Sequence, residues 1–413
     1  MDGRRQGLSR RGFIGSALAT GVACAFGETD GAASVPAGAR TYSVPLLGDT
    51  HFDAAPAETY HAAFIRRYAA AGLQPNKSRE HIRNGRMWAG PMRDIIRASA
   101  QTVRDDAAFV LHLGDLVQGD CCDGTVHRRM LEDAWRYFKG EYGAALPFVT
   151  VCGNHDVRDP DGHEAERVYA DFMPPRMAAE LGGRAVRPIT STDFVFRQGP
   201  DLFFVFDFND NKEVKVREPT VSHARFLRQR QLLLENRAAR HTFVVVHGGV
   251  FPLDKRSDFR WFWLGDPRQA DERREMMRLL AERNAIVLCG HQHVLSLKDA
   301  AFPQGRITEF TMNTVFYGHG MKENPAVPEV VYDDPAKFGS LSGENEWWKG
   351  ADARIHDEYR PHLRRCYHAK GGGHAVLRVS DAGVAVDYCG HAARTPTAVF
   401  TLRETGSREV RIG

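Results

Sequence analysis

Phe148-Val-Thr-Val-Cys-Gly-Asn-His-Asp156 is a stretch in which an apolar, β-branched run changes abruptly to polar side chains. The apolar part has the length and composition of a buried strand. Gly153 lets the chain turn sharply where that strand ends, and this brings the backbone close to the residues that follow. The stretch therefore predicts a buried strand that delivers an amide, an imidazole and a carboxylate at its carboxyl end.

Four other apolar runs stop at polar clusters in the same way, and they are Tyr42–Leu47, Phe109–Leu113, Thr242–Val246 and Ala285–Cys289. Stretches with helical character lie between the runs, namely Pro91–Asp105, His223–Arg237 and Pro267–Asn284. Strands that alternate with helices predict an α/β fold with largely parallel pairing. Near the C-terminus, His374–Val379 and Val384–Tyr388 predict a β-hairpin. We expect one domain over residues 40–413, because no internal repeat or linker divides this part of the sequence.

The composition is that of an ordinary folded protein. The 413 residues are 43% hydrophobic and 26% charged, which argues against the disordered and fibrous classes. The formal net charge of +3 is close to neutral. Nucleic-acid-binding proteins usually carry a strong basic excess, so we expect no general nucleic-acid binding. The sequence carries no indication of an oligomeric state.

The first 39 residues have the pattern of an export signal. Four arginines precede the apolar stretch Phe13–Phe26, and a small-residue cleavage site follows at Ala37-Gly38-Ala39. The segment Ser9–Ile14 resembles the twin-arginine consensus. We therefore expect a twin-arginine signal peptide over residues 1–39, contact with the twin-arginine export machinery, and a periplasmic or secreted protein. The apolar stretch is shorter than the roughly 20 residues of a membrane span, so none is expected in the mature chain; a lipid anchor on Cys24 stays open.

The polar clusters at the ends of the five runs are expected to meet in space. In open α/β sheets, ligands bind beyond the carboxyl ends of the strands, so residues far apart in sequence converge there. The clusters are Asp49-Thr50-His51, Gly114-Asp115, Gly153-Asn154-His155-Asp156, His247 and Gly290-His291-Gln292-His293. In type, order and spacing this series resembles the signature of the calcineurin-like metallophosphoesterase superfamily. The resemblance implies a four-layer α/β/β/α sandwich with two mixed β-sheets.

A dinuclear metal centre is also implied by the resemblance. It assigns Asp49, His51 and His293 to one metal ion, Asn154, His247 and His291 to a second, and Asp115 to a bridge between them. The residues themselves agree, because Asp49 and His51 are two apart and would project to the same side of an extended segment. Mixed carboxylate, amide and imidazole ligands suit two divalent or mixed-valence ions of Fe, Mn or Zn better than Ca or Mg.

Metal-dependent hydrolysis of a phosphoester is the activity that the resemblance implies. The metal ions lower the pKa of a bridging water toward neutrality, which gives a hydroxide that attacks phosphorus. His155 matches the family residue that protonates the leaving oxygen. We expect Asp156 to orient the imidazole of His155 and to raise its pKa, and we assign both residues as catalytic.

Departures from the family pattern narrow the substrate class. Gln118 stands where many relatives carry Asp, and Leu116-Val117-Gln118-Gly119 has neither the Tyr of purple acid phosphatases nor the Asp-Arg-Gly of Ser/Thr protein phosphatases. His155 stands where relatives that cleave UDP-diacylglucosamine have Arg. A phosphodiesterase that acts on a phosphorylated small molecule, either a small diester or a nucleotide, is therefore favoured. The alternatives are a phosphomonoesterase of the same fold, a nuclease, and a non-catalytic binding protein.

Three other segments carry weaker indications. The stretch Phe52–Gly90 contains several basic residues that could meet substrate phosphates, but a solvated surface insertion is the favoured interpretation. Phe259–Trp263 could stack on a base or a sugar, although core packing is favoured. Cys366 and Cys389 are the pair expected to form a disulfide in an oxidising compartment.

Overall fold

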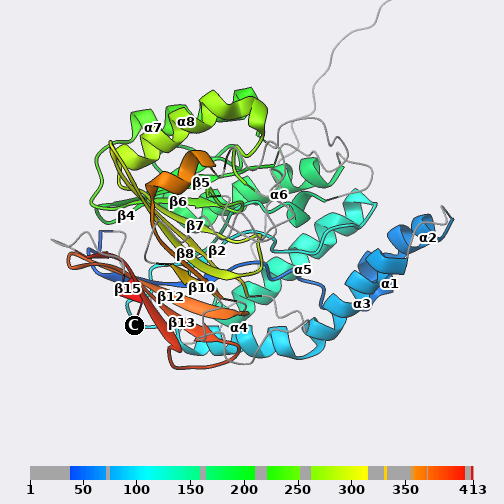
Figure 1. Ribbon diagram of the computed structural model, residues 1–413. Helices are drawn as coiled ribbons and strands as arrows, with labels where there is room; N and C mark the ends of the chain where they lie inside the picture. The colour runs from blue at the N-terminus through cyan, green and yellow to red at the C-terminus, as the bar shows by residue number, and fades with distance from the viewer. Residues whose placement is uncertain are drawn as a thin grey trace, which may run out of the picture. The chain divides into compact units, whose positions relative to one another are not determined.

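Two β-sheets form the centre of the structure, a computed structural model, and helices cover their outer faces (Figure 1). The structure describes residues 38–70, 75–158, 164–209, 221–251, 262–314, 330–332, 355, 357–369, 371–404 and 411–412. Residues 1–37 of the expected signal peptide, Cys24 among them, lie outside this part of the chain. None of the described helices is long and apolar enough to cross a membrane.

The first sheet has seven strands in the order β15-β14-β13-β12-β1-β2-β3. They are β1 (Tyr42–Leu47), β2 (Val110–His112), β3 (Phe148–Thr150), β12 (Gly373–Ser380), β13 (Gly383–Gly390), β14 (Ala398–Glu404) and β15 (Arg411–Ile412). β1, β2 and β3 are parallel, so their carboxyl ends lie at the same edge. The predicted hairpin is confirmed, because β12 and β13 pair antiparallel across a tight turn.

The second sheet has eight strands in the order β10-β11-β8-β9-β7-β6-β5-β4. They are β4 (Phe194–Gln198), β5 (Asp201–Phe206), β6 (Thr242–Val246), β7 (Ile286–Cys289), β8 (Leu295–Phe302), β9 (Gly305–Thr311), β10 (Val330–Tyr332) and β11 (Leu363–Ala369). β5, β6, β7 and β9 are parallel neighbours, whereas β4, β8, β10 and β11 pair antiparallel. The expectation of largely parallel pairing is thus wrong for the outer strands, because several consecutive strands are joined by short turns that impose antiparallel pairing.

The helices are α1 (Ala57–Tyr60), α2 (Ala62–Ala70), α3 (Pro75–Ala89), α4 (Pro91–Gln101), α5 (Gly124–Tyr142), α6 (Glu164–Leu181), α7 (His223–Glu235) and α8 (Ala270–Glu282). Short 3₁₀ helices are η1 (His155–Val157), η2 (Gly182–Arg184), η4 (Pro267–Gln269) and η6 (Arg360–His362). All five strands and all three helices expected from the sequence are present, with boundaries that differ by a few residues at most.

Alternating side chains of the strands produce the layers, because successive residues of a strand point to opposite faces of the sheet. In β5, Phe203 and Val205 belong to the core shared by the two sheets, while Phe204 and Phe206 belong to a second core that also contains residues of α7 and α8. On the other side, α4 contacts β12 and α6 contacts β3. The expected α/β/β/α sandwich with two mixed sheets is therefore confirmed (Figure 1).

The expected disulfide between Cys366 and Cys389 is wrong. Cys366 lies on β11 in the second sheet, whereas Cys389 lies on β13 in the first sheet and is a free thiol. Both side chains are buried, so these cysteines act as small apolar residues within different sheets.

The interpretation of Phe52–Gly90 as a solvated surface insertion is also wrong for much of its length. The stretch forms α1, α2 and α3, and His81, Asn84 and Trp88 of α3 are each only 1% exposed. Residues spaced in this way lie on one face of a helix, and that face packs against the protein. The side chains of Lys77 and Arg79 lie outside the described residues.

Core packing is confirmed for the part of Phe259–Trp263 that the structure describes. Trp263 is only 2% exposed, and its Nε1 donates a hydrogen bond of 2.9 Å to Gln229 Oε1 of α7. A buried Trp whose indole N–H has a partner within the protein is a core residue rather than a stacking platform for ligands. Trp261 lies outside the described residues.

Candidate metal centre

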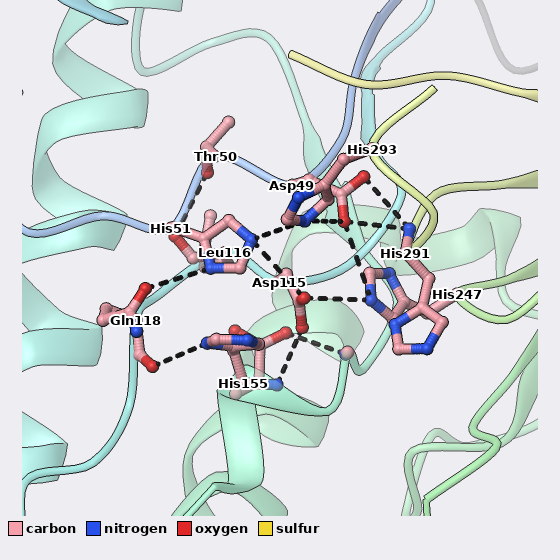
Figure 2. A network of polar contacts seen from close by, with 12 residues as sticks. Asp49, Thr50, His51, Asp115, Leu116, Gln118, His155, His247, His291 and His293 are labelled. Atoms are coloured by element: carbon pink, nitrogen blue, oxygen red, sulfur yellow. Dashed lines mark hydrogen bonds and ion pairs between the residues drawn. The ribbon is translucent and has the colours of Figure 1, made fainter. Parts of the chain in front are cut away.

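The predicted ligands follow the carboxyl ends of five strands. Those that converge from both sheets in Figure 2 are Asp49, His51, Asp115, His247, His291 and His293. Asp49 and His51 follow β1, Asp115 follows β2, Asn154 follows β3, His247 follows β6, and His291 and His293 follow β7. Two groups have ligand atoms within 4.8 Å of one another, and both contain Asp115: Asp49, His51, Asp115 and His293 form one, and Asp115, His247 and His291 form the other. The structure thus places Asp115 where two adjacent ligand sets meet.

The first group surrounds a common point with two imidazoles and two carboxylates. His51 Nε2 lies 3.1 Å from His293 Nε2 and 3.6 Å from Asp115 Oδ2. His293 Nε2 lies 3.4 Å from Asp49 Oδ1. Metal–nitrogen bonds of about 2.0–2.1 Å bring the ligand atoms of one ion to separations of this size. These four side chains therefore have the arrangement of ligands around a single cation.

The second group lies on the other side of Asp115. His247 Nε2 is 3.1 Å from Asp115 Oδ2, the same oxygen that His51 approaches. The rings of His247 and His291 have centroids 4.9 Å apart. One carboxylate oxygen with imidazoles on both sides is suited to bridging two ions.

Asn154, which the resemblance assigns to the second ion, has a side-chain oxygen of the kind that a bound metal ion would satisfy. Its Oδ1 is buried and makes no hydrogen bond to the described residues. A buried polar atom without a partner typically costs about 1–3 kcal/mol, so such atoms are rare unless a ligand satisfies them. An amide oxygen is a suitable ligand for a transition-metal ion that also takes carboxylate and imidazole groups. The residues present therefore fit a dinuclear centre.

The backbone is left-handed, rather than extended, at the ligands that follow β1 and β7. Asp49 and His51 have φ angles of 52° and 45°, and His291 and His293 have φ angles of 70° and 54°. The expectation that Asp49 and His51 project from an extended segment is therefore wrong. Left-handed backbone costs roughly 1–3 kcal/mol at residues other than glycine and is concentrated at functional sites. Here it turns both side chains of each pair toward the centre.

Two glycines allow the close approach of backbone that the sequence predicts. A Cβ atom at Gly153 would collide with the backbone nitrogen of Asp115, and one at Gly290 would lie 2.6 Å from Asp49 Oδ2. Residues with side chains cannot replace these glycines unless the ligands move. The close packing of strand ends thus requires glycine at position 153, as the sequence predicts, and also at position 290.

In two of the histidines, the ring nitrogen that faces away from the centre donates a hydrogen bond to the protein, and this orients the ring. His247 Nδ1 donates to Leu113 O at 2.6 Å, and His51 Nδ1 donates to Gln118 Oε1 at 3.1 Å. In both cases Nε2 is left with its lone pair directed at the centre, which is the tautomer that a metal ligand needs. Gln118 thus supports a ligand from outside the metal centre (Figure 2).

Two side chains of helix α3 form hydrogen bonds with Gln118 and with the backbone of Thr50 and His51. Asn84 Nδ2 donates a hydrogen bond to Gln118 Oε1, and Trp88 Nε1 donates to His51 O at 2.8 Å and to Thr50 O at 3.0 Å. Neither Asn84 nor Trp88 was predicted to have a role, because the polar composition of this stretch obscures the helix face that is buried. The spacing of residues 81, 84 and 88 along one helix face is the feature that could have identified them.

Replacing Gln118 by Leu is expected to lower the metal affinity or kcat/KM by about 10- to 100-fold, because the imidazole of His51 loses the acceptor that fixes its orientation. Competition with a chelator measures the metal affinity, and steady-state kinetics measure kcat/KM. Gln118→Glu, which keeps an acceptor oxygen at the same distance, is the matched control. Wild-type metal affinity and activity in the Leu variant would show that Gln118 has no supporting role.

His155 lies beside the first group, with ring contacts that differ from those expected. Its Nδ1 donates to Gln118 O at 3.0 Å, and its Nε2 accepts a hydrogen bond of 2.8 Å from Arg158 Nη1. Its ring centroid is 4.2 Å from that of His51. The ring therefore faces the candidate metal centre (Figure 2).

The expectation that Asp156 orients His155 and raises its pKa is wrong. The carboxylate of Asp156 accepts hydrogen bonds from Gly153 N at 2.9 Å and Val117 N at 3.0 Å, and so holds two strand-end loops together. Burial, together with the positive charge of Arg158, lowers the pKa of His155 well below its usual value. The carbonyl of Gln118 and the guanidinium of Arg158 orient the ring instead.

A comparison with family models identifies a family that covers all the predicted ligands. The family model described as calcineurin-like phosphoesterase matches residues 43–295, which include every predicted ligand. A search of curated protein sequences found no significant match. Among solved structures, PhoD is similar with a TM-score of 0.52 and 13% identity, over 92% of this chain and 72% of that chain. A dimetal phosphatase from Danio rerio is similar with a TM-score of 0.45 and 12% identity, over 88% of this chain and 99% of that chain.

Proposed function

Because its residues 43–295 match the family model, the chain belongs to the calcineurin-like phosphoesterase family, and from this premise we propose that it hydrolyses a small phosphodiester or a nucleotide. Metal-dependent hydrolysis of a phosphoester at a dinuclear centre is the activity of the family. The observation that carries the proposal for this chain is the pair of ligand groups that share Asp115.

The ligand assignment follows the two groups. Asp49, His51 and His293 would hold one ion, Asn154, His247 and His291 the other, and Asp115 would bridge them. Two ions of Fe, Mn or Zn at these residues would supply Lewis acidity for the phosphoryl oxygens and lower the pKa of an attacking water. The imidazoles of His51 and His247 are held in place by buried hydrogen bonds from their Nδ1 atoms. Little reorganisation of these two ligands is therefore needed when a substrate binds.

His155 is the residue in position to donate a proton to the leaving oxygen. Its Nδ1–H is held by Gln118 O, so Nε2 is the atom that carries the transferred proton. Arg158 Nη1 donates to Nε2, and the positive charge of Arg158 opposes protonation there. Arg158 must therefore release Nε2 before His155 can act as an acid, and a substrate phosphate is an anion that can compete for its guanidinium.

Two observations favour a diester over a monoester. Leu116-Val117-Gln118-Gly119 lacks the residues typical of purple acid phosphatases and Ser/Thr protein phosphatases. In addition, Arg158 is paired with Asp120, with Nη2 2.5 Å from Oδ2, so part of its charge is neutralised within the protein. A diester carries one negative charge on its phosphate, whereas a monoester carries up to two and needs more positive charge around it.

Hydrolysis of a nitrophenyl phosphodiester and of the matching monoester by the purified, Mn²⁺-loaded chain tests this proposal. The diester should be cleaved with the higher kcat/KM. Faster cleavage of the monoester would make the protein a phosphomonoesterase, and cleavage of neither compound would support a non-catalytic role.

We also propose that the chain is exported by the twin-arginine route to the periplasm or the exterior of the cell. The pattern of residues 1–39 supports this proposal. Replacing both Arg10 and Arg11 by Lys should leave a C-terminally tagged chain in the cytoplasm, as measured by cell fractionation. Export that continues in the double variant would contradict the route, and a cytoplasmic wild-type chain would contradict the location.

A further inference from the structure

A second cluster of possible metal ligands lies outside the centre described above. It consists of Asp53, in the segment after β1, His61, between α1 and α2, and His81, on α3. One ligand atom from each of these residues lies within 4.8 Å of those of the other two, and all three side chains are buried, with exposed fractions of 1%, 0% and 1%.

His61 directs one ring nitrogen at the carboxylate of Asp53. Its Nε2 is 3.1 Å from Asp53 Oδ1. Its Nδ1 is 3.5 Å from Asp120 O, a carbonyl that can only accept a hydrogen bond. With the hydrogen on Nδ1, the lone pair of Nε2 and the carboxylate oxygen can bind one cation; with the hydrogen on Nε2, these two atoms form a hydrogen bond instead.

The position of His81 favours a bound metal ion over a hydrogen bond between His61 and Asp53 alone. Its Nδ1 lies 4.0 Å from Asp53 Oδ2, which is too long for a hydrogen bond but within the range of two ligands of one ion. Its ring stacks on that of His61, with centroids 3.7 Å apart and an angle of 22° between the planes. The two imidazoles thus approach the same carboxylate side by side, which a single proton between His61 and Asp53 does not explain.

Asp120 lies beside the outer ring nitrogens of both imidazoles. Its backbone carbonyl faces His61 Nδ1, and its carboxylate Oδ2 is 3.8 Å from His81 Nε2. Histidine ligands of metal ions commonly direct the second ring nitrogen at a carbonyl or carboxylate, which fixes the tautomer and the orientation of the ring. The same Asp120 carboxylate is paired with Arg158, which contacts His155.

We propose that Asp53, His61 and His81 bind a further transition-metal ion, separate from the dinuclear centre, with Asp120 supporting both histidines. Two imidazoles and one carboxylate, with a water completing the shell, form a donor set that suits Zn²⁺. The ion joins α3 to the segments that carry His51 and Gln118, and through Asp120 and Arg158 it is connected to His155. Its role in this position is to hold the inserted helices against the catalytic loops.

The number of bound ions tests the proposal. The full-length wild-type chain is loaded with excess Zn²⁺, freed of unbound metal by gel filtration and analysed by inductively coupled plasma mass spectrometry. His81→Gln should bind one Zn²⁺ per chain fewer than the wild type, and His61→Gln should show the same difference. Because the readout is a difference, it does not depend on how many ions the dinuclear centre holds or on whether the chain hydrolyses phosphoesters.

His374→Gln is the matched control, because His374 is a fully buried histidine on β12 whose Nε2 donates to Ala393 O. This variant should keep the wild-type metal content, and circular dichroism confirms that each variant is folded. If either folded variant, His81→Gln or His61→Gln, binds as much Zn²⁺ as the wild type, the proposal is wrong. A loss of more than one ion per chain in either variant would equally overturn it.

Discussion

Asp115→Asn should lower kcat/KM for a phosphodiester by at least about three orders of magnitude. Asp115 Oδ2 lies between His51 and His247, and Oδ1 accepts a hydrogen bond of 2.8 Å from His155 N. The substitution keeps the shape of the side chain but removes the negative charge shared by the two ligand groups. Loss of metal-ion catalysis removes several kcal/mol of transition-state stabilisation, and each 1.36 kcal/mol corresponds to about tenfold in rate.

The prediction is measured by steady-state kinetics together with the metal content of the variant. Asp381→Asn is the control, because that carboxylate is exposed in the turn between β12 and β13, where it pairs with Arg40 at 2.6 Å and Arg240 at 2.7 Å. The control variant should keep the wild-type rate and metal content. If Asp115→Asn retains both, the shared carboxylate is not a bridge and the dinuclear assignment is incorrect.

His155→Ala should reduce kcat by roughly 10²- to 10⁴-fold while the metal content stays unchanged. The imidazole is not needed as a metal ligand, and its loss removes the group placed to protonate the leaving oxygen. An alkyl leaving group needs this proton more than nitrophenolate does, so the loss should be larger for an alkyl phosphodiester than for the nitrophenyl compound.

The dependence on the leaving group separates catalysis from packing. A purely structural His155 would lower the rates of both substrates by the same factor or would release metal. Turnover at the wild-type rate with both ions bound would remove His155 from the mechanism.

Much of the fold and of the centre could be predicted because the relevant signals are local in sequence. Each of the five predicted strands is a short apolar run, and the ligand-bearing residues follow directly, as in Gly153–Asp156 and Gly290–His293. The parallel arrangement of β1, β2 and β3, and of β6 and β7, then brings those strand ends together. Local pattern and sheet topology were therefore sufficient to assemble the candidate ligands.

The features that could not be predicted depend on contacts between distant segments. The buried face of α3 lies beside His51 because of contacts between segments that are distant in sequence. The basic residues of the same stretch instead indicated a solvated surface insertion. The partners of His155 were missed for a related reason. Asp156 is its neighbour in sequence, but the 3₁₀ turn η1 directs that carboxylate at Val117 N and Gly153 N, while Arg158 returns to the ring.

The most direct test of the central claim is a metal titration of the purified full chain after treatment with a chelator, followed by hydrolysis of a nitrophenyl phosphodiester. A dinuclear hydrolase should be inactive without metal and should regain activity as Mn²⁺ is added, whereas Asp115→Asn should stay inactive at every Mn²⁺ concentration. Full activity in the metal-free protein, or equal recovery in Asp115→Asn, would contradict the assignment of this centre.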